Sequence, residues 1–519
     1  MSEQEKLTTP RETRSWWRTF IRITLVVFAL LLAARMIWGV MTAKELDQAV
    51  QAVQKYGEPL TLAELPHPTV SPADDAWPIY RQLLDKVAAT GIGAAPLLAH
   101  KADTGTLSEA EQAQLTQDKA DDELLDAWWK NLGARAEKAP QVQARVEAGA
   151  ELLALLRQAS AKPQAGWPVV EDPFSPAINE AMLLYRVVQL AGADAILQFD
   201  AGRPQAALDD VAALLQLSNH LSSMHGIVGR QWEIITAQYA CEALQEMLPR
   251  LDLSAEQAGR LRALLQGGTG TAALRPTAIH NRAMYQTIYL KLISNQMTID
   301  AAPDGKNDIG WSGRLKNWIY RPFVDASQAY NLQQYAKFLP LLDQPYVQAA
   351  GKLDEIEKAA IEAGSSISGF TRQWGVANTF YVVATARMTA MSRATRDMAS
   401  VALAVRLYQL QQGKLPARLE ELVPTYLPAL PADALCGAPL GYISQGPAPR
   451  LYSTGLDRAD NGGSYQMTED PQGLKGHDVC FFLTGVPADA RPQPATTSAP
   501  TTSSAPSTAP TTTSQERTN

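Results

Sequence analysis

Residues 183–217 read LLYRVVQLAGADAILQFDAGRPQAALDDVAALLQL, and this stretch decides the fold class. A turn is expected at Gly202-Arg203-Pro204, because glycine interrupts a helix and proline suits the first turn of the next one. After the turn, apolar residues recur at the i, i+3, i+4 and i+7 spacing of one helix face: Leu208, Val211, Ala212 and Leu215. The pattern predicts a helical hairpin between Glu180 and Ser222.

The rest of residues 42–375 has the same character, rich in alanine, leucine and glutamine and poor in strand-like alternation. Helix starts are expected at Ser108 and Ser254, since Glu111 and Gln257 complete a capping box three residues later. The hairpin is similar to a tetratricopeptide unit, but no second copy follows at a period near 34 residues. We therefore expect a large, irregular α-helical domain, with a repeat solenoid as the alternative.

Residues 23–41, ITLVVFALLLAARMIWGVM, are apolar except for Arg35. A helix of this length spans about 28 Å, close to the thickness of a bilayer core. The apolar core continues past Ala33-Ala34 with Arg35-Met36-Ile37-Trp38, which favours an uncleaved transmembrane anchor over a signal peptide. Arg35 can extend its guanidinium to the outer interface.

Basic residues gather before the apolar run, in a tip covering residues 1–22: Lys6, Arg11, Arg14, Arg18 and Arg22. Only Lys44 and Lys55 follow it closely, so the N-terminus is expected in the cytoplasm and the bulk of the chain outside. The expected location is the inner membrane of a bacterium, with the body in the periplasm or outside the cell.

The composition indicates a folded protein, with 46% hydrophobic and 19% charged residues among 519. The net charge is −7 and most of the clustered basic residues lie in the N-terminal tip. The outer part therefore carries no basic footprint for nucleic acid, and nucleic-acid binding is not expected.

A second module is expected over residues 376–487. A helix from Val376 to Gln412 should end at Gly413, and a short helix should follow through Leu422. Three short strands are then expected at 440–443, 450–453 and 479–483, between glycine-rich turns. The expected fold is an α+β module in which the helix packs on a small antiparallel sheet. Polar stretches 301–313 and 364–375 are expected to be loops, the second marking the boundary.

Several motifs of this module occur in a fixed order: Leu407-Tyr408, then Gly413-Lys414 with Pro416, then Leu422-Val423-Pro424, then Tyr452-Ser453 with Gly455 and Asp457. In this order the module, about 393–483, resembles the C-terminal domain of the major pseudopilin of type II secretion systems. In that family the apolar, glutamate-bearing segment begins the helix that leads into the sheet. Here the apolar run lies about 350 residues upstream and lacks glutamate. The resemblance therefore implies a pilin-like fold used as a distal domain, not a place in a secretion filament.

The same module holds a candidate calcium site. Calcium takes six to eight oxygen ligands, and a glycine-rich loop with close aspartates can supply them. The pseudopilin family binds calcium in this loop, so the resemblance implies Asp457, Asp460 and Asp478 as ligands. The alternative is an ordinary solvated Asp-Gly turn.

Three cysteines occur in the chain. Cys436 and Cys480 share the C-terminal module, and an oxidising compartment would permit a disulfide between them. Two free thiols are the alternative. Cys241 lies in an expected helix, where a small buried side chain is its expected role.

Other residue groups point to structural roles. His220 and His225 are five apart, which does not place them on one helix face as a zinc pair. Asp209-Asp210 is expected at a solvated helix end. Core packing or loop anchoring is expected for the aromatic group, which could otherwise line a groove: Trp311, Trp318, Tyr320, Phe323 and Tyr330. Residues 488–519 are almost entirely Ala, Pro, Thr and Ser, a composition that predicts a disordered tail.

No Walker loop, GxSxG, GxGxxG or HExxH motif occurs in the sequence. The favoured hypothesis is a non-enzymatic, membrane-anchored envelope protein that binds other proteins. The alternative is an envelope enzyme, of hydrolase type, whose site is assembled from residues scattered over the helical domain.

Overall fold

The computed structural model describes residues 11–90, 107–130, 135–173, 177–268, 274–297, 309–365, 372–465 and 476–487. The tail at 488–519 and the first ten residues of the basic tip lie outside these ranges. Within them the protein is mainly α-helical, with one small sheet near the C-terminus. The expected fold class is confirmed in both respects.

The first half of the chain contains the helices from α1 to α8. Their bounds are α1 Arg11–Gln54, η1 Leu62–Glu64, α2 Trp77–Thr90, α4 Glu109–Lys130, α5 Arg135–Ala148, α6 Ala150–Ser160, α7 Ala177–Asp200 and α8 Pro204–Leu221. The predicted hairpin is α7 and α8, with Gly202 at φ +75° in the turn and Pro204 opening α8. Both predicted capping boxes form, at Ser108 and at Ser254.

The second half contains the remaining helices and the sheet. Their bounds are α9 Gly226–Met247, η3 Leu248–Arg250, α10 Ala255–Gln266, α11 Leu274–Ile293, α12 Trp311–Leu342, α13 Tyr346–Ser365, α14 Gln373–Gln412, η6 Leu419–Leu422, β1 Gly441–Ile443, β2 Arg450–Ser453 and β3 Val479–Phe482. The polar stretches predicted as loops are shorter than expected, because α12 already begins at Trp311 and α14 at Gln373. Residues 301–308 of the first stretch and 366–371 of the second lie outside the described residues.

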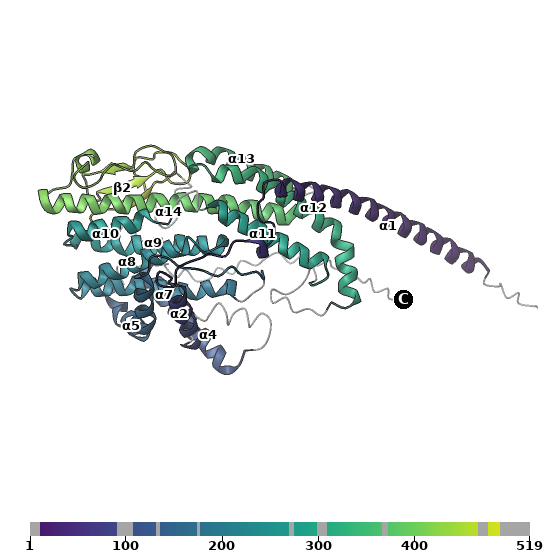
Figure 1. Cartoon of the computed structure of the whole chain (residues 1–519), viewed down its shortest axis with the longest axis horizontal. Coiled ribbons are helices and arrows are strands. Elements are labelled where there is room, and N and C mark those ends of the chain that lie inside the picture. The colour runs from purple at the N-terminus through teal and green to yellow at the C-terminus, as the bar shows by residue number, and fades with distance from the viewer. Residues whose placement is uncertain are drawn as a thin grey trace, which may run out of the picture.

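Helix α14 runs along the body and joins its parts (Figure 1). It packs against α9, α10, α12 and α13, and its C-terminal half packs against β2 and β3. The stretch Met398–Val405 is fully buried, and Gly413 ends the helix with φ +70°. The boundary predicted at residue 376 therefore falls in the first turn of a helix that both the body and the C-terminal module share.

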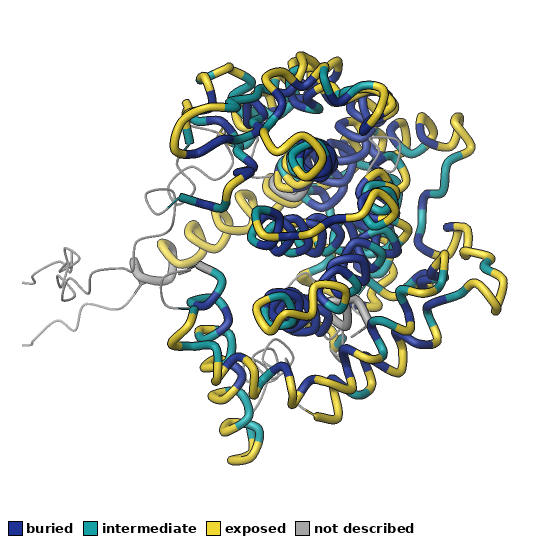
Figure 2. The backbone as a smooth tube through the Cα atoms, turned by 90° about the vertical axis from the view of Figure 1, so that its left-hand side faces the viewer, coloured by how far each residue is buried: buried dark blue, intermediate teal, exposed yellow. Residues whose placement is uncertain are grey.

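The three strands form an antiparallel sheet in the order β1-β2-β3, with Tyr442 opposite Leu451 and Leu451 opposite Phe481. The inward residues Leu451 and Phe481 join one hydrophobic core with α7, α8, α9 and α14. Figure 2 shows the inner helices buried along their length and the outer ones exposed on one side. The sheet thus completes the core of the helical body at one end.

Helix α1 leaves the other end of the body (Figure 1). Its apolar stretch is exposed, and within the described residues it is the one helix long and apolar enough to cross a membrane. Length and apolarity of this kind fit either a membrane anchor or a secretion signal. Its C-terminal half packs on α12, and Leu46, Ala49 and Val53 are buried in a small core with α11 and α12.

Candidate functional site

The loop predicted to bind calcium lies beside the sheet, between β2 and β3. Asp478 is buried and accepts hydrogen bonds from the backbone N–H groups of Asn461 (3.2 Å) and Gly463 (2.6 Å). Asp457 accepts from the Ala459 N–H at 3.0 Å, and Asp460 from the Gly462 N–H at 2.8 Å. The loop's own donors thus occupy at least one oxygen of each carboxylate.

Asp478 is affected electrostatically by the other two carboxylates of the loop. Burial raises the pKa of Asp478, backbone donors oppose that shift, and the charges of Asp460 and Asp457 add to it. A bound cation would relieve the repulsion. Among residues 11–487, omitting the undescribed stretches, no three His, Cys, Asp or Glu side chains are grouped as metal ligands. Residues 466–475 of this loop are not described, so calcium binding stays a prediction.

Asp433 is a structural carboxylate of this module that sequence reasoning missed. It is buried and accepts from the Leu435 N–H (2.9 Å), the Ser453 hydroxyl (2.9 Å) and the Thr454 N–H (3.0 Å). It therefore fastens the end of β2 to the turn at 433–437. Ser453, the serine of the Tyr-Ser motif, donates one of these hydrogen bonds. This bond gives a structural reason for a serine at that position of the motif.

Cys436 and Cys480 are both free thiols in this structure, which is the alternative to the disulfide that the sequence left open. The Cys436 thiol lies 3.4 Å from an Asp433 oxygen, and the Cys480 thiol lies 3.7 Å from the Gly463 carbonyl. Burial raises the pKa of Cys480 to about 12, so this thiol stays protonated. Cys241 is buried in α9 as expected, and burial raises its pKa to about 12 as well.

His220 has the structural role that its spacing indicated. It is buried in α8, with Nδ1 2.8 Å from the Tyr80 hydroxyl and Nε2 3.0 Å from the Lys162 carbonyl. Burial lowers its pKa to about 4, so it is neutral at ordinary pH. His225 instead precedes α9 and faces His280 across 5.9 Å between ring centres. His220 and His225 therefore lie in separate environments and do not form a pair.

A buried charge cluster joins two helices that are far apart in sequence, α9 and α14. Arg230 and Glu233 of α9 form an ion pair, and Arg396 of α14 lies beside them, all with at most 1% of the residue exposed. Arg396 donates to Asn219 Oδ1 (3.1 Å) and to the Gly267 carbonyl (3.0 Å). Burial raises the pKa of Glu233 and lowers that of Arg396, while the opposite charges oppose both shifts.

One oxygen of Glu233, Oε1, has no hydrogen-bond partner among the described residues. A Cβ at Gly268 would lie 3.3 Å from this oxygen and 2.8 Å from Asn219 Oδ1, so glycine allows the chain to pass closely there. Arg396 is 163 residues from Glu233 in the chain, and its position in an ordinary helical pattern signals neither burial nor pairing. Sequence reasoning had no means to find this cluster.

Asp210 was expected at a solvated helix end, and that expectation is wrong. Asp210 is 1% exposed and accepts from Arg157 Nε at 2.6 Å, while Asp194 pairs with the same guanidinium. Asp210 faces the core because it shares one face of α8 with the buried residues Ala207 and Leu214, at i−3 and i+4. Burial raises its pKa to about 6.

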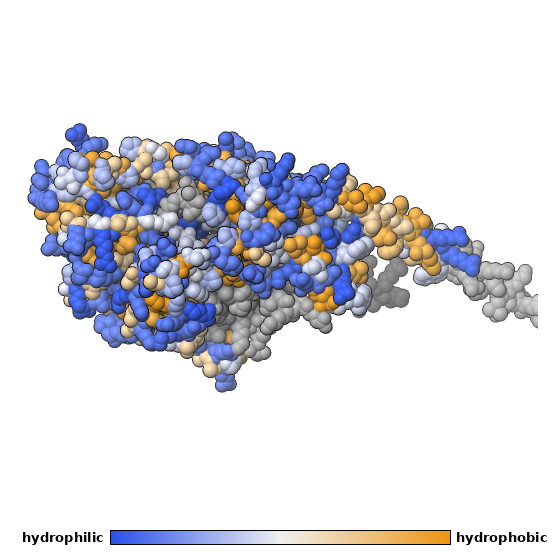
Figure 3. Space-filling view, viewed as in Figure 1, coloured by the Kyte–Doolittle hydropathy of each residue, from blue (hydrophilic) through white to orange (hydrophobic). Residues whose placement is uncertain are grey.

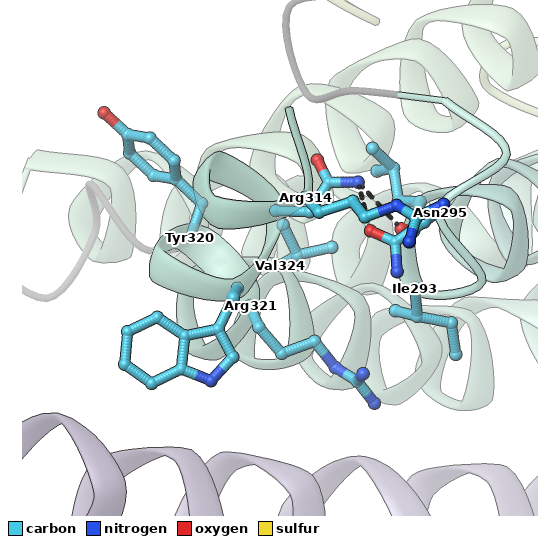
Figure 4. Close-up of a pocket in the computed structure, with 9 residues that line it drawn as sticks. Ile293, Asn295, Arg314, Tyr320, Arg321 and Val324 are labelled. Atoms are coloured by element: carbon cyan, nitrogen blue, oxygen red, sulfur yellow. Dashed lines mark hydrogen bonds between the residues drawn. The ribbon is translucent and has the colours of Figure 1, made fainter. Parts of the chain in front are cut away.

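A pocket of about 120 Å³ lies between the end of α11 and the start of α12 (Figure 4). Asn317 closes one side by donating to the carbonyls of Leu292 (3.1 Å) and Met297 (2.8 Å). Arg314 and Arg321 line the pocket, and Arg321 is held by Asp325 at 2.9 Å. Figure 4 shows Tyr320 directed away from the pocket and α1 running past it.

The aromatic group predicted in this region divides in two. Tyr330 is buried, as expected for core packing, whereas Trp311 is 79% exposed and Trp318 and Tyr320 are each 42% exposed. Core packing is therefore wrong for Trp311, Trp318 and Tyr320, and Trp318 lines the pocket, in line with the alternative that this group lines a groove. The reason is that α12 begins at Trp311, whereas apart from Gly313 its residues are buried only from Pro322 onward.

No family model, curated protein or solved structure matches this chain. The pseudopilin resemblance of the C-terminal module therefore stays a prediction from its sequence motifs.

Proposed function

We propose that the protein is a single-pass, membrane-anchored component of a bacterial envelope, with its N-terminus in the cytoplasm and its body outside. Its role is to bind other proteins without catalysis. The C-terminal module is the proposed pilin-like head, and its Asp457, Asp460 and Asp478 loop is the proposed calcium site.

The continuity of α1 carries the anchoring part of this proposal. One unbroken helix of 44 residues includes the apolar stretch and the part that packs on the body. The side chain of Arg35 bonds to the Trp318 carbonyl, and the Trp38 ring lies 4.4 Å from the Phe323 ring. Because these contacts begin within the apolar run itself, cleavage of a signal peptide after Ala34 would leave them at a new chain end.

The orientation rests on the excess of basic residues before the apolar run, which is the arrangement that retains a segment in the cytoplasm. The intact mass of the mature protein from native membranes tests anchoring directly. Retention of residues 1–41 supports the anchor, and a mature chain that starts after this segment contradicts it.

The binding role rests on the apolar helix, the pilin-like head and the lack of a catalytic motif in the sequence, and three buried acidic groups have structural roles. Asp210, Asp433 and Asp478 each accept hydrogen bonds from neighbouring groups, which are roles in holding the fold. Affinity capture of the full chain from native membranes tests this role. Recovery of defined envelope proteins supports it, and their absence, with the chain intact, contradicts it.

An envelope enzyme is the second candidate, and the Arg230, Glu233 and Arg396 cluster is the observation that favours it. Shifted pKa values grouped around a buried carboxylate with an unpartnered oxygen are common in active sites. Screening the full chain against esterase, peptidase and glycosidase substrates separates the candidates. Turnover that Glu233→Gln abolishes in a folded chain would establish the enzyme and overturn the binding role.

A further inference from the structure

The first three turns of α12 present an apolar stripe away from the body. Trp311, Leu315, Trp318 and Ile319 follow the i, i+4, i+7, i+8 spacing of one helix face, and each is at least 42% exposed. On the opposite face, Gly313 and Val324 are buried and Asn317 bonds to the end of α11. The segment is thus fixed to the body on one side and apolar on the other.

This stripe lies at the end of the body from which α1 leaves. Pro322 stands inside α12, where proline bends a helix. The turns before it run across that end of the body, while the turns after it continue into the body (Figure 1). Figure 3 shows hydrophobic residues along most of α1 and patches of them, among hydrophilic residues, at this adjoining end.

The first turns of α12 contact α1 near the C-terminal end of the apolar run. The Arg35 guanidinium lies 4.1 Å from the centre of the Trp318 ring, and Gly39 faces Pro322. Six residues separate Arg35 from the end of the run at Met41, which is about 9 Å of helix. If α1 spans the bilayer, Trp318 therefore lies near the outer boundary of the hydrocarbon core.

The composition of the segment suits that depth. Residues 311–323, WSGRLKNWIYRPF, contain two tryptophans and a tyrosine, the residues enriched at the membrane interface. They also contain Arg314, Lys316 and Arg321 but no acidic residue. A positively charged polar flank beside an apolar face is the pattern of helices that lie in the headgroup layer of anionic bilayers.

We propose that residues 311–320 form a second membrane contact, an interfacial helix that lies in the outer leaflet beside α1. Trp311, Leu315 and Ile319 insert among the acyl chains, and Arg314 contacts lipid phosphate. This contact, together with α1, fixes the orientation of the body above the membrane. The proposal rests on the proposed function, because it requires α1 to span the same bilayer.

Depth-dependent fluorescence quenching in reconstituted full-length protein tests this contact. An environment-sensitive fluorophore is attached at Leu315→Cys, in a background carrying Cys436→Ser and Cys480→Ser. The vesicles contain phosphatidylethanolamine and phosphatidylglycerol, with or without brominated acyl chains. Leu410→Cys is the matched control, since Leu410 is 40% exposed near the end of α14, remote from α1. Val27→Cys reports on α1 itself.

Quenching by brominated lipid at positions 315 and 27, but not at 410, is the expected result. Quenching at 27 without quenching at 315 overturns the interfacial helix and leaves the anchor intact. An unquenched label at 27 overturns both. A label at 315 that is shielded from aqueous iodide but not quenched by lipid assigns the stripe to a protein contact, a second copy or a partner, and likewise overturns the proposal.

Discussion

The guanidinium of Arg35 stacks on the indole ring of Trp318, 4.1 Å from its centre, and also bonds to the Trp318 backbone carbonyl. The two residues are 283 positions apart and join the apolar helix α1 to the first turns of α12. Arg35 is the one charge of the apolar run, and this contact gives it a fixed partner. The pair thus couples the proposed anchor to the body.

Trp318→Ala should weaken the packing of α1 on α12. The loss of the cation–π contact alone should cost about 1 kcal/mol. Hydrogen exchange of the detergent-solubilised full chain should increase in residues 42–54 and 311–322. Tyr56→Ala, at a side chain 77% exposed, serves as the control and should leave exchange unchanged. Equal exchange in both variants would show that the pair does not fasten α1.

Glu233→Gln should destabilise the body strongly. The substitution removes the carboxylate charge between two buried guanidinium groups, Arg230 and Arg396, and leaves them uncompensated. Breaking a buried pair in this way costs about 3–5 kcal/mol. Chemical denaturation of the full chain measures the effect, with the exposed Glu256→Gln as the control. A loss below about 1 kcal/mol would contradict the proposed burial of all three charges.

Asp210 should make stability depend on pH. Burial raises its pKa to about 6 from 3.8, so the folded chain binds this proton more tightly than the unfolded chain does. Its contribution is therefore complete below about pH 4 and is lost as the pH rises through 6, a change of about 3 kcal/mol. The free energy of unfolding of the wild type, relative to that of Asp210→Asn, should therefore fall by about 3 kcal/mol between pH 4 and pH 7. A difference that grows with pH would mean that the ion pair with Arg157 outweighs burial.

Calcium should raise the melting temperature of the full chain if the predicted loop binds it, because a ligand specific to the folded state stabilises that state. A shift of several degrees between calcium and chelator is expected, and Asp457→Ala should abolish it. Asp343→Ala, an exposed carboxylate in a different region, should retain it. Identical melting curves with calcium and with chelator would exclude the site.

The strands and helix ends of the C-terminal module could be predicted because local rules determine them. The strand over 450–453 was placed without error, and Gly413 ends α14 since its left-handed conformation suits glycine. The same holds for the turn at Gly202 and for the serine caps. Each of these features depends on residues within a few positions of one another.

The buried polar groups could not be predicted, because their environment comes from distant parts of the chain. Arg396 is enclosed by Ser218 and Asn219, 178 and 177 residues away, and Asp210 is buried by the packing of α6 and α8. The exposed apolar stripe on α12 was also missed, because the sequence does not show what covers an apolar helix face. An apolar helical pattern in sequence indicates a buried face, without saying whether protein or lipid covers it.

Labelling of introduced cysteines in intact cells tests the topology most directly, since the remaining Cys241 is buried. Ser15→Cys lies in the basic tip and Tyr56→Cys follows α1, both in a background with Cys436 and Cys480 replaced by serine. A membrane-impermeant maleimide should label position 56 in cells with a permeable outer membrane, and position 15 only after lysis. Labelling of position 15 before lysis, or protection of position 56 until lysis, would contradict the anchored, outward-facing protein described above.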